Sequence, residues 1–194
     1  MIDTFFNLGI IAQAWPILLT GFGATLVLTA ITVPLGCLSG LLLAAGSTIR
    51  HPLVRWPLMA WVDFFRALPP LVLLIFLYAG LPFAGVRIGA YGCVALGFFL
   101  NTGAYYGEIL RAVVLPQAIR MTVPPLTNRT IAITKGTALG SVIGLAEILS
   151  QATAGESLSF NPSPLTLGAA AYLLLFLPVV ALGRWIETRF AWKR

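Results

Sequence analysis

The stretch Asn101-Thr-Gly-Ala-Tyr105-Tyr-Gly-Glu108-Ile-Leu-Arg111-Ala-Val-Val-Leu-Pro116-Gln-Ala-Ile-Arg120-Met-Thr-Val-Pro124-Pro125-Leu-Thr-Asn128 decides how this chain is arranged. Its first third completes one apolar run, residues 88–110, and its end leads into a second, residues 131–152. The about 18 residues from Arg111 to Asn128 carry arginines and the prolines 116, 124 and 125. Because proline breaks helices, we expect an irregular connection between two membrane-spanning helices.

The composition of the whole chain points to lipid as its main solvent. Of 194 residues, 59% are hydrophobic and 9% are charged, whereas soluble domains carry about a quarter charged residues. The net charge of +6 would suggest nucleic acid in a soluble protein. These residues cannot build an exposed basic and aromatic surface, so we expect no nucleic-acid partner. The composition predicts an all-α domain in the lipid bilayer.

Five segments are long and apolar enough to span a bilayer, which takes about 20 helical residues. They are residues 18–45, 58–81, 88–110, 131–152 and 166–185. Pro69-Pro70 falls within the second, so that helix must bend there or have its freed backbone groups satisfied by neighbours. Residues 1–17 are expected to form an N-terminal interfacial segment that ends near Trp15-Pro16, with a hairpin of two spans as the alternative. Residues 18–190 then form the transmembrane domain, and residues 191–194 a cytoplasmic tail.

The distribution of basic residues predicts the orientation by the positive-inside rule. Basic residues fall between the first and second spans, between the third and fourth, and at the C-terminal end: Arg50, Arg55, Arg111, Arg120, Arg129, Arg184, Arg189, Lys193 and Arg194. Only Arg87 falls on the other side. We therefore expect the N-terminus outside and the C-terminus in the cytoplasm of a multi-pass protein.

Two ionisable residues fall inside the fourth span, where charges are costly and usually face a cavity or a partner. Lys135, near the inner boundary, is interpreted as a snorkelling side chain or as a pathway residue. Glu147, toward the outer side, is a candidate partner for the ammonium group of an amino acid, or else an interfacial residue.

Residue spacing predicts which side chains share a helix face. Asn101 and Tyr105 are four apart, so they either line a polar pathway or bond across helices. Local ion pairs are expected for Asp63 with Arg66 and for Glu108 with Arg111. The residues Gly136, Gly140 and Gly144 recur every four positions, which predicts one close-packing face, either toward a partner or within the subunit. Gly36 and Gly40 on the first span repeat this pattern more weakly.

The sequence carries no set of residues typical of a catalytic site. It has one histidine, His51, and its two cysteines, Cys37 and Cys93, lie in apolar runs without a metal-binding or redox spacing. We therefore predict no enzyme, no metal and no cofactor, and uphill transport would draw its energy from another polypeptide or from an ion gradient.

Several motifs resemble one family over most of the chain. The segment 101–111, the Leu115-Pro116-Gln117-Ala118 motif with Arg120, Pro124 and Asn128, and Lys135-Gly136-Thr137-Ala138-Leu139 followed by Glu147 are similar to the inner-membrane permease subunits of ABC importers for polar amino acids. Residues 63–71 resemble that family's Phe-Arg-Gly-Thr-Pro-Leu-Leu segment.

The resemblance implies a five-helix core in the inner membrane, with three kinds of partner. These are an ATP-binding subunit, an extracytoplasmic substrate-binding protein and a second permease subunit, identical or related. The candidate pathway residues are Asn101, Tyr105, Lys135, Thr137 and Glu147.

One departure from the family concerns the cytoplasmic loop that docks on the ATPase. In the family this loop separates the part that matches Arg111-Ala112 from the part that matches Val114-Leu115-Pro116, and here the two parts abut. The remnant of the coupling region is Glu108, Arg111, Pro116, Gln117 and Arg120. The leading hypothesis is a transport permease, and the alternative is a degenerate permease that acts as a membrane scaffold without ATPase contact. A gradient-driven carrier would depend on Glu147.

Overall fold

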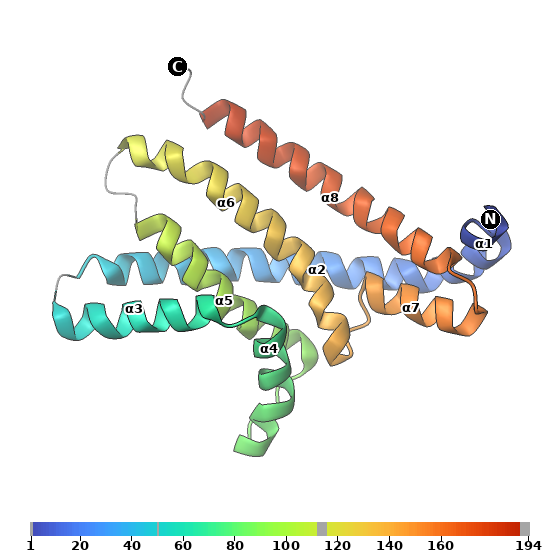
Figure 1. Ribbon diagram of the computed structural model, residues 1–194, viewed down its shortest axis with the longest axis horizontal. Coiled ribbons are helices and arrows are strands. Elements are labelled where there is room, and N and C mark those ends of the chain that lie inside the picture. The colour runs from blue at the N-terminus through green and yellow to red at the C-terminus, as the bar shows by residue number, and fades with distance from the viewer. Residues whose placement is uncertain (1, 50, 112–115, 191–194) are drawn as a thin grey trace.

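The computed structural model describes residues 2–49, 51–111 and 116–190, and all regular structure within them is helical. The order is α1 (Ile2–Phe5), α2 (Leu8–Ser47), α3 (Pro52–Ala67), α4 (Pro70–Ile75), a π-helical turn (Phe76–Gly80), a 3₁₀ turn (Leu81–Ala84), α5 (Ala90–Arg111), α6 (Pro116–Gly136), a 3₁₀ segment (Thr137–Ile143), α7 (Ile148–Ser159) and α8 (Ser163–Phe190). Figure 1 shows α2 as the long axis of the molecule, with α4 projecting away from it. The predicted all-α class is confirmed.

Helix α2 is one continuous helix of 40 residues, about 60 Å long at 1.5 Å per residue. Asn7 caps its start, because Asn7 Oδ1 accepts hydrogen bonds from the backbone N–H groups of Gly9 and Ile10. The break expected near Trp15-Pro16 is absent, and so is the alternative hairpin, because Pro16 lies inside the helix. Residues 8–17 therefore belong to the same helix as the first predicted span, residues 18–45.

The second predicted span, residues 58–81, is broken. Helix α3 ends at Ala67, and the axis turns by 100° before the Pro70–Ala84 segment. Pro69 and Pro70 lie at this turn, where neither has an N–H to continue the helical ladder of hydrogen bonds. The sequence predicted that one helix bends at this proline pair. The observed turn is large enough to make α3 and α4 two separate helices.

The fourth predicted span, residues 131–152, is displaced and interrupted. Helix α6 begins at Pro116 and runs through Pro124 and Pro125, so the prediction that these prolines prevent a helix was wrong. Proline fits helical φ, and α6 is held by packing against α5 and α8. Gly144 then ends the 3₁₀ segment at φ +81°, a left-handed conformation that favours glycine. The three glycines 136, 140 and 144 therefore do not share one α-helical face.

The core lies where α2 crosses α5. Gly103 packs against Ser39, Gly36 against Thr102, and Gly40 against Tyr106, and a Cβ built on any of these glycines would overlap its neighbour. Small residues let two helix backbones approach closely. The close-packing face thus lies at Gly36 and Gly40, where the sequence pattern was the weaker one.

Among the described residues, two helices, α2 and residues 163–189 of α8, are long and apolar enough to cross a membrane, and the number rises to four if each bent pair is one span. The five predicted spans are therefore not confirmed, and α5 is not among these apolar segments. Helix α5 tolerates polar residues because neighbouring helices bury much of it.

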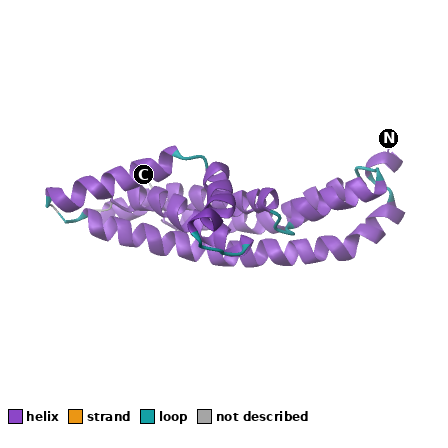
Figure 2. Cartoon of the chain, turned by 90° about the horizontal axis from the view of Figure 1, so that it is seen from below, coloured by secondary structure: helices purple, strands orange, loops and turns teal. Residues whose placement is uncertain are grey.

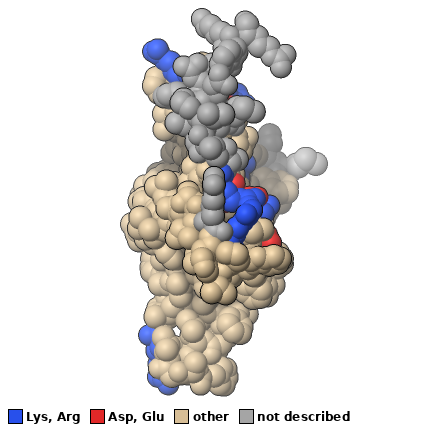
Figure 3. All heavy atoms as spheres, turned by 90° about the vertical axis from the view of Figure 1, so that its left-hand side faces the viewer, with Lys and Arg blue, Asp and Glu red and all other residues tan. Residues whose placement is uncertain are grey.

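Seen from below, the helices form a flat, elongated assembly (Figure 2). Seen from the end that contains the α2–α3 turn, one patch of basic side chains lies beside acidic ones, and other basic side chains lie apart from it (Figure 3).

Candidate translocation site

A polar cluster forms where α5 and α6 meet the break between α3 and α4. In an unbroken helix, the N–H groups of residues 69 and 70 would bond to the carbonyl oxygens of Phe65 and Arg66. Both residues are prolines, so these acceptors lose their helical donors. Asn101 Nδ2 donates to the Phe65 oxygen at 2.7 Å and to the Leu68 oxygen at 3.2 Å. Tyr105 Oη donates to the Arg66 oxygen at 3.1 Å.

The spacing of Asn101 and Tyr105 on α5 matches the spacing of the carbonyls that the two prolines leave open. Their shared helix face, predicted from the sequence, therefore faces the end of α3. Asn101 is 1% exposed, and a buried polar group without a partner is costly, so both the amide and the carbonyls gain from this arrangement. Of the two roles expected from the sequence, the structure describes bonding across helices.

Arg129 joins α6 to this cluster. Its Nη2 donates to Asn101 Oδ1 at 3.0 Å, and its guanidinium carbon lies 3.6 Å from the centroid of the Tyr105 ring. A guanidinium stacked on an aromatic face is attracted by the ring quadrupole. Asn101 is thus bonded on both sides, through its nitrogen to α3 and through its oxygen to α6.

A group of paired charges lies beside the cluster, toward the end of α5. Glu108 Oε1 accepts a hydrogen bond from Arg111 Nη2 at 2.7 Å. Arg66 Nη1 lies 4.0 Å from Glu108 Oε1 and 4.0 Å from Asp63 Oδ1. The close Glu108–Arg111 geometry agrees with the sequence expectation, whereas Arg66 is shared between two carboxylates instead of pairing with Asp63 alone.

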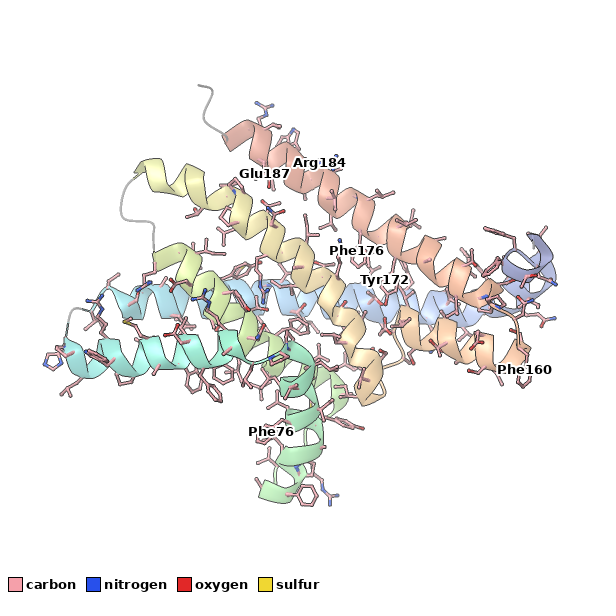
Figure 4. All side chains as sticks on the ribbon, viewed as in Figure 1. Phe76, Phe160, Tyr172, Phe176, Arg184 and Glu187 are labelled. Carbon is pink, nitrogen blue, oxygen red and sulfur yellow. The ribbon has the colours of Figure 1, made fainter. Side chains whose placement is uncertain are left out.

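Glu147 is fully buried and caps a helix. Its two carboxylate oxygens accept from the N–H groups of Leu149 and Ser150 at the start of α7. Tyr172 of α8 donates to the same carboxylate at 2.5 Å. Figure 4 shows Tyr172 one turn from Phe176 on α8, and their rings are stacked at 5.5 Å. Glu147 therefore ties α7 to α8 and is not open to a ligand in this conformation.

The other predicted pathway residues lie apart from the cluster. Lys135 is exposed near the end of α6. Thr137 is buried, and its hydroxyl donates to the Thr134 carbonyl oxygen at 2.7 Å. Gly136 packs against Phe98 of α5, and Gly140 lies near Val94 and Leu145.

Comparison with known proteins identifies the family of the chain. Residues 97–192 match the family described as binding-protein-dependent transport system inner membrane component. The chain is 30% identical to the L-cystine transport system permease protein TcyB of Bacillus subtilis, over 71% of this chain and 70% of that protein. The chain belongs to the amino-acid ABC permeases of this family. Permeases of this kind are transport components, and ATP is hydrolysed on a separate subunit.

Two further proteins are similar over more of their length. The probable amino-acid ABC transporter permease protein YckA of Bacillus subtilis is 29% identical, over 76% of each chain. A crystal structure of an amino acid ABC transporter with histidines superposes with a TM-score of 0.84 at 28% identity, covering 92% of this permease and 96% of that chain. The permease fold therefore extends through nearly the whole sequence.

The junction beside Ala112, where the sequence predicts that a coupling loop is missing, lies outside the described residues. Pro116, Gln117 and Arg120 belong to the first turns of α6, and their side chains are also outside the described part.

Sequence reasoning missed the roles of Arg129 and Tyr172. The positive-inside rule treats Arg129 only as an orienting charge, although it lies within one turn of the fourth predicted span. Tyr172 is the sole tyrosine in residues 166–185, which was a signal for a buried hydroxyl that needs a partner.

Proposed function

We propose that this permease forms the translocation pathway of an ATP-driven importer of polar amino acids. The observation that carries the proposal is the 0.84 TM-score match to an amino acid ABC transporter over 92% of the chain. The names of the relatives support the substrate class, since they include a cystine and a glutamine permease. The pathway would run past the corner of α3 and α4, where backbone carbonyls, Asn101, Tyr105 and Arg129 form a polar site inside an apolar protein.

In this proposal the chain crosses the inner membrane five times, with the bent pairs α3–α4 and α6–α7 each counted as one span and α5 as another. The N-terminus is outside and the C-terminus is cytoplasmic. The basic residues between the first and second predicted spans, between the third and fourth, and at the C-terminal end support this orientation. Residues 1–17 lie at the outer interface, and residues 191–194 form the cytoplasmic tail.

The proposed complex contains a second permease subunit, two ATP-binding subunits and an extracytoplasmic substrate-binding protein. Alternating access would follow from rocking of the two permeases about a midplane site. Broken helices at such a site are typical of transporters, because irregular backbone at membrane depth is tolerated where protein or a cavity surrounds it.

The predicted loss of the coupling loop, inferred from the motif halves that abut beside Ala112, makes coupling to the ATPase the property to test. The permease is co-expressed with an ATP-binding subunit and a binding protein from the same source, purified through the permease and reconstituted in liposomes. A parallel variant carries a family-type loop inserted between Ala112 and Val113. Substrate-stimulated ATP hydrolysis and uptake by the unmodified chain are the expected results. Retention of the ATPase only by the loop-bearing variant would instead indicate a scaffold that is uncoupled as it stands.

A further inference from the structure

Arg129 is the cation of the polar cluster that has no acidic partner. In the described part of the chain, no carboxylate oxygen lies within 4.0 Å of its guanidinium. Its contacts are one hydrogen bond to Asn101 and the face of Tyr105. Its Nε is buried without a hydrogen-bond partner. A guanidinium carries five N–H donors and stays charged, so most of its hydrogen-bonding capacity is unused here.

The acidic residues near the cluster are already engaged. Glu108 is bonded to Arg111 and lies beside Arg66, and Asp63 also lies beside Arg66. Glu147, the carboxylate expected to meet a substrate ammonium group, is 0% exposed and bonded to α7 and to Tyr172. Arg66 therefore has two nearby carboxylates, whereas Arg129 has none.

Tyr105 and Asn101 also hold Arg129 in position before any ligand arrives. Arg129 and Tyr105 are only partly buried, so the Arg129 side chain keeps some exposed surface. A planar guanidinium with free N–H groups binds carboxylates through paired, charge-assisted hydrogen bonds. In a membrane protein an unpaired charge of this kind marks a substrate or ion site more often than a purely structural one.

We propose that Arg129 binds the carboxylate of the transported amino acid and thereby restricts this permease to neutral and acidic amino acids. This rests on the proposed function as an amino-acid importer and adds the substrate class. A zwitterion with an uncharged side chain places its α-carboxylate on Arg129, and an acidic side chain adds attraction. A basic side chain meets the repulsion of Arg129 in a medium of low dielectric. The nearby carboxylates of Asp63 and Glu108 lie beside Arg66, and neither is within 4.0 Å of Arg129.

The test measures equilibrium binding and uptake separately. The complete transporter, with its second permease and ATP-binding subunits, is reconstituted in nanodiscs without binding protein. Radiolabelled glutamine, glutamate and arginine are the probes, and glutamine amide, which lacks the α-carboxylate, is a competitor. The variants are Arg129→Gln, Arg129→Lys, and the control Arg184→Gln on the exposed side of α8 (Figure 4). ATP-driven uptake into liposomes is measured in parallel.

We expect the unmodified complex to bind glutamine and glutamate, with arginine at least about tenfold weaker, as loss of one charged hydrogen-bonded contact would give. Glutamine amide should compete poorly. Arg129→Gln keeps a donor for Asn101 and should lose about tenfold in binding, Arg129→Lys should retain part of it, and Arg184→Gln should bind normally.

Arginine binding as tight as that of glutamine, or full binding by Arg129→Gln, would overturn the assignment and leave Arg129 as a structural link between α5 and α6. Either result is compatible with ATP-driven uptake. The importer function would then be supported by the uptake measurement alone. Binding with the expected selectivity but without any uptake would refute the importer and keep the Arg129 site. If Arg129→Gln does not fold, Arg129→Lys still tests the proposal because it keeps the positive charge. A folded Arg129→Lys complex that retains part of the binding supports the proposal.

Discussion

The side-chain amide of Asn101 replaces the backbone N–H that Pro69 lacks. Asn101 Nδ2 lies 2.7 Å from the Phe65 carbonyl oxygen, the acceptor that residue 69 would satisfy in a continuous helix. One turn along α5, Tyr105 does the same for Pro70 through the Arg66 oxygen. The corner between α3 and α4 is therefore held by α5, so any motion of this corner must involve Asn101 and Tyr105.

The first prediction concerns the coupling between Asn101 and Pro69. Asn101→Ala should destabilise the purified permease by about 1–3 kcal/mol, because the buried Phe65 carbonyl and the partly buried Leu68 carbonyl lose their donor. In a Pro69→Ala background the same change should cost less, since residue 69 then supplies an N–H. A double-mutant cycle of thermal stability in detergent measures the difference. Equal costs in the two backgrounds would show that the amide does not act through this carbonyl.

The second prediction separates the hydroxyl of Tyr105 from its ring. Tyr105→Phe removes the bond to the Arg66 oxygen and keeps the face on which Arg129 lies, whereas Tyr105→Leu removes both. We expect Tyr105→Leu to lower stability by a further about 0.5–2 kcal/mol, the range of a cation–π contact. The effect should shrink when Arg129 is replaced by Gln. If the two Tyr105 variants prove equally stable, the stacking contributes nothing measurable.

The third prediction tests close packing at the crossing of α2 and α5. A Cβ at Gly103 would overlap Ser39, so Gly103→Ala must move α5 or α2 and should cost about 1–3 kcal/mol. Gly23, in the partner helix α2, is the control because no neighbouring atom lies within 4 Å of its added Cβ. Gly23→Ala should be neutral or stabilising by up to about 1 kcal/mol. Thermal unfolding of both variants in one detergent gives the comparison, which fails if Gly103→Ala is as stable as Gly23→Ala.

The fourth prediction assigns Glu147 a structural role. Glu147→Ala removes the cap of α7 and should cost about 1–2 kcal/mol, while Glu147→Gln keeps one acceptor oxygen and should be milder. Tyr172→Phe should resemble Glu147→Gln, because it removes only the bond between α8 and the cap. Uptake by folded Glu147→Gln should persist. Complete loss of uptake with normal stability would return Glu147 to the substrate pathway or to a gradient-coupled mechanism.

Part of the polar cluster could be predicted from the sequence. The four-residue spacing of Asn101 and Tyr105 placed them on one face, and Pro69-Pro70 indicated an interruption. The sequence did not connect these two observations, since they are separated by more than 30 residues along the chain. Arg129 was missed for a related reason, because a single arginine near a span end is equally typical of an orienting charge.

The sequence by itself determined the solvent, the helical class and the family. Composition excludes a soluble globule, apolar runs in lipid must be helical to satisfy their backbone, and the motif around residues 101–128 is shared with amino-acid permeases. Tertiary structure decided where the helices break and which side chains are engaged. A proline pair produces a corner at residues 69 and 70 because α5 supplies the missing donors there. Pro124 and Pro125 stay within α6, which is packed between α5 and α8. Partner groups from distant segments thus decide whether a proline ends a helix, and local sequence does not contain them.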